Sequence, residues 1–186
     1  MADITAGLLS IGCISILAYL PLMCYLDWTE RRVPLELFVG LLTINIPVTS
    51  YLYLTGILSI YHLISSLLVI AFAFFLWKKF GQGAFSAADR NLIICIGLFF
   101  FWNPFSAEMD VHYVGFISEF TLVWFIVWYI VVMCCLPLIL AGYNLVTQKY
   151  KKGYKLWQMI TQFGDRGIPM ILPIAAAFIL ALVHGI

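Results

Sequence analysis

The stretch that decides the fold runs from Ile4 to Leu26 and reads ITAGLLSIGCISILAYLPLMCYL. It holds no charged residue over about 23 positions, which at about 1.5 Å per residue is enough to cross about 30 Å of hydrocarbon. The only charge before it is Asp3, whereas a secretory signal begins with basic residues. We therefore expect this stretch to remain in the mature protein as a first membrane-spanning helix.

The composition of the whole chain leads to the same conclusion. Of the 186 residues, 64% are hydrophobic and 10% are charged, against about 45–50% and about 25% in soluble domains. These fractions give about 119 apolar positions, and six spans of about 20 residues need about 120. A water-soluble domain is excluded, and we expect residues 1–186 to form a single membrane domain. The net charge of +1 argues against nucleic-acid binding.

Five further apolar stretches follow, and the tight break Thr55-Gly56 separates two of them. We expect an all-α, polytopic membrane protein with six transmembrane helices. The five later spans are predicted at Leu35–Leu54, Ile57–Trp77, Ala84–Trp102, Phe120–Gly142 and Ile168–Val183.

The basic residues show how the chain is oriented, because all ten lie on the side that the chain reaches after the first, third and fifth predicted spans, with Arg90 near the start of the fourth. The loops after the second and fourth spans contain no Lys or Arg. Basic loops stay in the cytoplasm, so we expect both termini to lie outside it. The protein is expected to be a multi-pass protein of the cell membrane. The ten residues are Arg31, Arg32, Lys78, Lys79, Arg90, Lys149, Lys151, Lys152, Lys155 and Arg166.

Two aspartates are the candidate catalytic residues. Asp27 follows the first span directly, and Asp89 lies at the start of the fourth, so both are expected at the cytoplasmic face at similar depth. Ionisable groups at membrane depth are costly and indicate function. Two adjacent carboxylates can share a proton and activate a water molecule. The helix dipole predicts that Asp27, at a helix C-terminus, holds that proton.

Each aspartate also has a purely structural interpretation. Asp27 could close its helix and pair with Arg31 or Arg32. Asp89 follows Ser86 by three residues, which is the spacing of a helix-capping box. Either interpretation accounts for one aspartate, whereas their joint placement is more specific.

At these positions the chain resembles the archaeal type IV prepilin peptidases, a family that includes the preflagellin peptidases. Asp27, the basic residues after it and Val33-Pro34 match the first aspartate motif of that family, and Ala88-Asp89-Arg90 matches the second. The last predicted span contains Pro169 and Pro173, which is also similar to the proline-rich late span of that family. One departure is Ser86-Ala87-Ala88, where the family commonly has glycine.

The resemblance implies a membrane aspartic endopeptidase with Asp27 and Asp89 as catalytic residues. It would cut the basic leader from prepilin-like or preflagellin precursors at the cytoplasmic face, with no cofactor and no metal. Glu30 and Glu36 are candidate contacts for the basic leader. Asp165 is a third aspartate, but its loop does not match the placement in the family.

Two other classes of function remain open. An ion- or proton-coupled transporter could use the same aspartates, although it would favour charges near the membrane midplane. A catalytically inactive relative could act as an assembly partner. We interpret Asn45, His62 and Ser65 as polar packing residues, and the five cysteines as buried small side chains.

Overall fold

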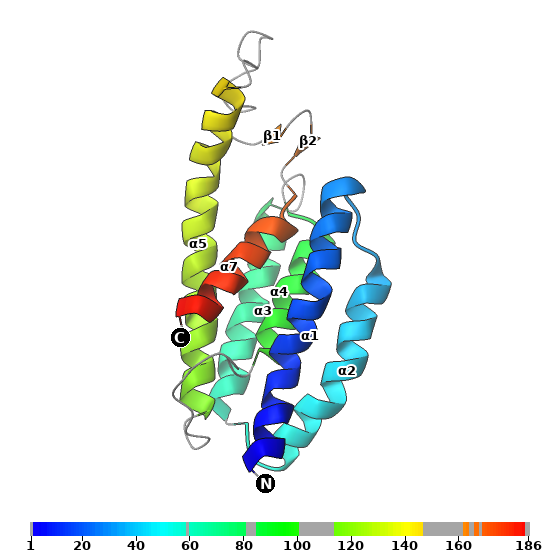
Figure 1. Ribbon diagram of the computed structural model, residues 1–186. Coiled ribbons are helices and arrows are strands. Elements are labelled where there is room, and N and C mark those ends of the chain that lie inside the picture. The colour runs from blue at the N-terminus through cyan, green and yellow to red at the C-terminus, as the bar shows by residue number, and fades with distance from the viewer. Residues whose placement is uncertain are drawn as a thin grey trace.

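The computed structural model describes residues 2–58, 60–80, 85–100, 114–146, 162–163, 166–167 and 169–184. These residues form helices and one antiparallel pair of two-residue strands (Figure 1). The elements are α1 (Ala2–Thr29), α2 (Leu35–Leu54), α3 (Ile60–Phe80), α4 (Ala87–Phe99), α5 (Val114–Val146), β1 (Gln162–Phe163), β2 (Arg166–Gly167) and α7 (Ile171–His184).

Four helices are long and apolar enough to cross a membrane, which confirms the all-α prediction at this level. The segments that qualify lie in α1, α2, α3 and α5 and have 20 to 25 residues each. At about 1.5 Å per residue each is about 30 Å long or longer, which matches the hydrocarbon core of a bilayer. The segments are Ala6–Thr29, Leu35–Leu54, Ile60–Phe80 and Leu122–Val146.

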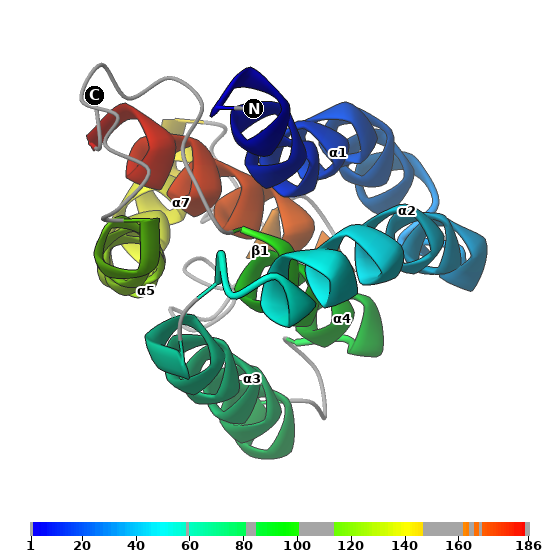
Figure 2. The same ribbon diagram turned by 90° about the horizontal axis from the view of Figure 1, so that it is seen from below.

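The helices α4 and α7 are shorter than the spans predicted there, with 13 and 14 residues. Each is therefore only about 20 Å long. The helix α4 packs against α1, α2, α3 and α7, and its residues Leu92, Ile93 and Ile96 are fully buried. Figure 2 shows α7 lying between α5 and α1. The count of six membrane spans and the placement of the termini remain predictions.

Polar side chains join neighbouring helices inside the bundle. The Asn45 amide donates to Ser15 Oγ at 2.8 Å and thereby connects α2 to α1. The Ser66 hydroxyl donates to the Gly97 carbonyl at 2.7 Å and connects α3 to α4. The prediction for Asn45 is confirmed, whereas on α3 it is the buried Ser66, rather than Ser65, that forms the interhelical bond. Ser65 and Ser66 lie on different faces of α3, and the sequence alone does not show which of them faces α4.

The turn between α2 and α3 forms at the predicted break Thr55-Gly56. Gly56 has a φ of 71°, in the left-handed region that glycine adopts without steric cost. The N–H of Ile57 donates back to the Leu52 carbonyl at 3.0 Å and closes the turn. As a result, α2 and α3 run antiparallel.

Three helix termini that carry the candidate site lie at one end of the bundle. The C-terminus of α1 and the N-termini of α4 and α7 meet there, and α5 extends beyond them (Figure 1). Asp27 lies in the last turn of α1 and Asp89 in the first turn of α4. The fold thus brings together residues that are far apart in the sequence.

Candidate active site

Asp27 is held by the first residue of α7. The backbone N–H of Ile171 donates to Asp27 Oδ2 at 3.1 Å. The first N–H groups of a helix have no partner within the helix, and the helix N-terminus carries partial positive charge. Asp27 thus satisfies one of these free groups, and its side chain is only partly buried.

Asp89 is held by the residue that caps its own helix. Ser86 Oγ accepts from the Asp89 N–H at 3.3 Å, and the Ser86 N–H donates to Asp89 Oδ2. These two bonds form the capping box that the spacing of Ser86 and Asp89 predicts. The structural interpretation is therefore correct for one oxygen of the carboxylate. The other oxygen, Oδ1, is buried and makes no hydrogen bond with the described residues.

The structure brings the two aspartates within electrostatic range of each other. Asp89 is 3% exposed, so this interaction takes place where water screens charge poorly. One carboxylate comes from the end of α1 and the other from the start of α4, as the sequence predicts. We refer to Asp27 and Asp89 together as the carboxylate pair.

The electrostatic setting of Asp27 differs from the one its own helix predicts. The sequence places Asp27 at a helix C-terminus, which disfavours a negative charge. In the structure it also faces the N-terminus of α7, which favours one. The charged Arg31 lies within electrostatic range of Asp27 as well. Asp27 does lie at the C-terminus of α1, but the α7 N-terminus and Arg31 oppose the effect on which the shared proton was assigned to it.

Arg31 reaches this position through an unusual backbone conformation. Its φ is 58°, and it is the one described non-glycine residue with a positive φ. This left-handed conformation costs about 1–2 kcal/mol for an L-residue other than glycine. The turn directly after α1 is therefore held by its surroundings close to Asp27.

The neighbouring Arg90 is directed toward α3. Its guanidinium lies 4.6 Å from the ring centre of Trp77 and 5.3 Å from that of Phe74. It also donates to the side-chain oxygen of Asn91 at 3.0 Å. Trp77 and Phe74 lie on α3, whereas Asn91 lies on α4 beside Arg90 itself.

Tyr129 is a residue of this region that sequence reasoning missed. It lies on α5, is 3% exposed and is within electrostatic range of Asp89. Its ring packs edge-on against Phe72, with centroids 5.9 Å apart. The sequence signal that could have pointed to Tyr129 is its polar hydroxyl within the long apolar stretch of α5.

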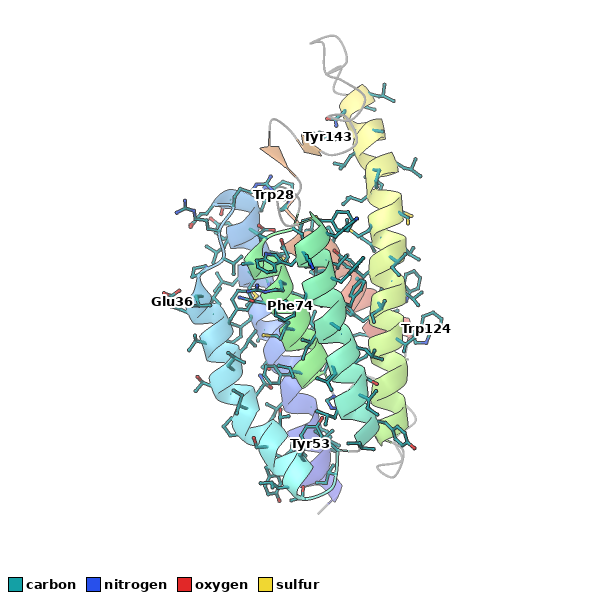
Figure 3. The ribbon with its side chains drawn as sticks, turned by 180° about the vertical axis from the view of Figure 1, so that it is seen from behind. Trp28, Glu36, Tyr53, Phe74, Trp124 and Tyr143 are labelled. Carbon is teal, nitrogen blue, oxygen red and sulfur yellow. The ribbon has the colours of Figure 1, made fainter. Side chains whose placement is uncertain are left out.

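The proposed leader contacts Glu30 and Glu36 are exposed. Glu30 lies in the turn after α1, and Glu36 lies in the first turn of α2. Figure 3 shows Glu36 on the outer side of α2, pointing away from the bundle, and Trp28 at the end of α1. Asp165 lies outside the described residues.

Among the described residues there is no group of three or more His, Cys, Asp or Glu side chains that could hold a metal ion. Comparison of the sequence with models of protein families, with curated proteins and with solved structures finds no match.

Proposed function

We propose that this protein is a membrane aspartic endopeptidase that removes the basic leader from prepilin-like or preflagellin precursors. One observation carries the proposal. Asp27 and Asp89, which are 62 positions apart in the chain, lie within electrostatic range at one end of a bundle of apolar helices. Paired carboxylates with one shared proton are a general device for activating water.

The surroundings of the two carboxylates support different roles. Asp89 is almost fully buried and its Oδ1 has no hydrogen-bond partner among the described residues, so that oxygen can carry the shared proton. Asp27 accepts an N–H from the N-terminus of α7 and is partly exposed, which suits the ionised base. In this proposal the proton assignment is the reverse of the one based on α1 alone.

Hydrolysis then proceeds in two steps. Asp27 takes a proton from a water molecule as the water oxygen bonds to the scissile carbonyl carbon, while Asp89 donates its proton to the carbonyl oxygen. The tetrahedral intermediate then collapses, its C–N bond breaks, and Asp27 passes a proton to the leaving amine. The intermediate's hydroxyl proton returns to Asp89, so the pair regains its starting state.

The proposed orientation follows from the charges at this end of the bundle. Arg31 and Arg32 follow α1, Lys78 and Lys79 lie in the last turn of α3, and Arg90 lies in α4. A basic face is the cytoplasmic one, which is where a precursor with a basic leader would present its cleavage site. The proposal includes six membrane spans and both termini outside the cytoplasm, and it places the protein in the cell membrane.

The test uses membranes that contain wild-type, Asp27→Asn, Asp89→Asn or Asp165→Asn protein, with a precursor that has a basic leader and an apolar helix. Asparagine keeps the shape of aspartate and removes its proton chemistry. We expect cleavage by the wild type and by the matched control Asp165→Asn, and none by the other two. If all four proteins fold and none cuts a range of pilin and archaellin precursors, the inactive relative or the transporter becomes the better account.

A further inference from the structure

The outward face of α7 forms the floor of an apolar groove. This face carries Leu172, Ala176, Ile179 and Val183 at helical spacing. Leu172 and Ile179 are each 48% exposed. Ala176 has the smallest side chain of the four and leaves a notch in the middle of the face. Figures 1 and 2 both show α7 between α1 and α5, so these two helices form the walls.

Two adjoining cavities make up this groove. One has a volume of about 320 Å³ and lies between α1 and α7, where Leu17, Pro21 and Cys24 line it. The other has a volume of about 280 Å³ and lies between α7, α5 and the end of α1, where Trp28 and Leu136 line it. Leu172 and Ala176 line both cavities, so the two cavities adjoin along α7.

Both sides of the groove lead to Asp27. On α1, Leu20, Cys24 and Asp27 follow one another at spacings of four and three residues, which places them on one helix face. On α7, Leu172 directly follows Ile171, whose N–H binds Asp27. From Leu17 to Trp28 the wall is about 16 Å long, or about three helical turns.

Access to the carboxylate pair is also on this side. Asp27 is partly exposed, whereas Asp89 is 3% exposed. A further cavity, of about 270 Å³, lies apart from the groove between α3 and α5, where Phe72, Tyr129 and Cys134 line it, and we call it the second cavity. A peptide bond that comes from the groove along α7 meets the exposed carboxylate first, whereas one that comes from the second cavity meets the buried one.

We infer that the groove formed by α1, α5 and the outward face of α7 binds the apolar helix of the precursor and places the start of that helix beside Asp27. This inference rests on the proposed function. Residues that line the groove have no charged side chain, which suits a helix inside the bilayer and excludes the basic leader. Small residues such as Ala175 and Ala176 let two helices approach closely in a membrane. The leader then extends past Trp28 toward the exposed Glu30.

The native cysteines provide a direct test, because Cys24 lines the groove and Cys134 lines the second cavity. One variant, Cys134→Ala with Cys135→Ala, keeps Cys24, and the matched variant, Cys24→Ala, keeps the other two. The buried Cys13 and Cys95 stay in both. A precursor with one cysteine at successive positions of its apolar helix is oxidised in membranes that contain each variant, and cleavage of the same precursor is measured in parallel.

We expect a disulfide-linked adduct with the variant that keeps Cys24, at precursor positions three to four residues apart, and at least a tenfold weaker adduct with Cys24→Ala. An adduct through Cys134 overturns the inference. Cleavage without any Cys24 adduct also overturns it, because lipid acyl chains are then the occupant of the groove. A disulfide between the Cys24 residues of two copies, formed equally with and without precursor, overturns it as well, because a second copy is then the occupant. In these cases cleavage still supports the proposed function, whereas absence of cleavage overturns both.

A second measurement fills the groove. Ala176→Trp is expected to raise KM for the precursor at least fivefold with little change in kcat, because the bulky ring occupies the place of the precursor helix. The matched control is Ala71→Trp, since Ala71 is exposed on α3, away from the groove. Equal KM values for the two variants contradict the inference.

Discussion

Polar side chains meet at both ends of the bundle, and the two meetings differ in kind. At one end His62 Nδ1 lies 2.7 Å from the Tyr53 hydroxyl, and the two residues are nine positions apart on either side of a tight turn. Figure 3 shows Tyr53 at the end opposite Trp28. At the other end Asp27 accepts an N–H from a residue 144 positions away.

The contact between Tyr53 and His62 serves packing, whereas the site around Asp27 is suited to chemistry. The histidine is fully buried and has a neutral phenol beside it, so it satisfies a polar group within a helical hairpin. The carboxylate pair places Asp27 where its charge opposes the ionisation of the buried Asp89, and Asp27 itself is partly exposed. Such an arrangement lowers the stability of the protein, so it is expected only where the two acids serve a function.

The largest effect is expected from Asp89→Glu, which separates helix capping from catalysis. Glutamate at this position preserves the capping box, and its extra methylene enters a buried site, so a loss of about 1 kcal/mol of stability is expected. The longer side chain moves the carboxyl group relative to Asp27, and a displacement of about 1 Å can cost about 100-fold in rate. Cleavage assays together with thermal unfolding in detergent measure both quantities. Wild-type activity in this variant would mean that Asp89 is only a helix cap.

A smaller effect is expected from Ser86→Ala, which removes the hydroxyl that accepts the Asp89 N–H. Loss of an N-cap costs about 1 kcal/mol of stability. If the same free energy is lost from the positioning of Asp89, cleavage becomes roughly fivefold slower. Ser86→Thr keeps the hydroxyl and should restore both stability and rate. The link between the cap and the site fails if Ser86→Ala is unstable but cuts at the normal rate.

A comparable loss of stability, with less effect on rate, is expected where α3 and α4 touch. A Cβ atom added at Gly97 would lie 2.9 Å from Val69 Cγ1, so Gly97→Ala forces the two helices apart. Overpacking of this kind costs about 1–3 kcal/mol. Gly142→Ala is the matched control, because nothing lies within 4 Å of a Cβ atom there. Denaturation midpoints should differ between the two variants, and equal midpoints would show that α3 and α4 are less closely packed than described.

The smallest effect on cleavage is expected from Tyr53→Phe at the opposite end. Removal of the hydroxyl leaves His62 without this hydrogen bond and costs about 1 kcal/mol of stability. Cleavage should stay within about twofold of the wild type, because no step at the carboxylate pair uses this end. A tenfold loss of cleavage in a folded variant would contradict the division between the two ends.

The sequence was sufficient to place both aspartates, because each stands at the border of a long apolar stretch. It also located the turn at Thr55-Gly56 and the capping box of Ser86 and Asp89, since these depend on residues close together in the chain. It could not predict the N–H of Ile171 as a partner of Asp27, because hydropathy does not show which helix termini are neighbours. The same limit concealed Tyr129, whose place beside Asp89 depends on how α5 packs against α3 and α7.

The central claim is that Asp27 and Asp89 act as one unit, and a double-mutant cycle tests it most directly. Cleavage rates of Asp27→Asn, Asp89→Asn and the double variant are measured on one precursor. Residues that act together are strongly non-additive, so all three variants should show the same residual rate, at least about 100-fold below that of the wild type. Losses that multiply in the double variant, or a single variant that keeps most of its activity, would contradict the account.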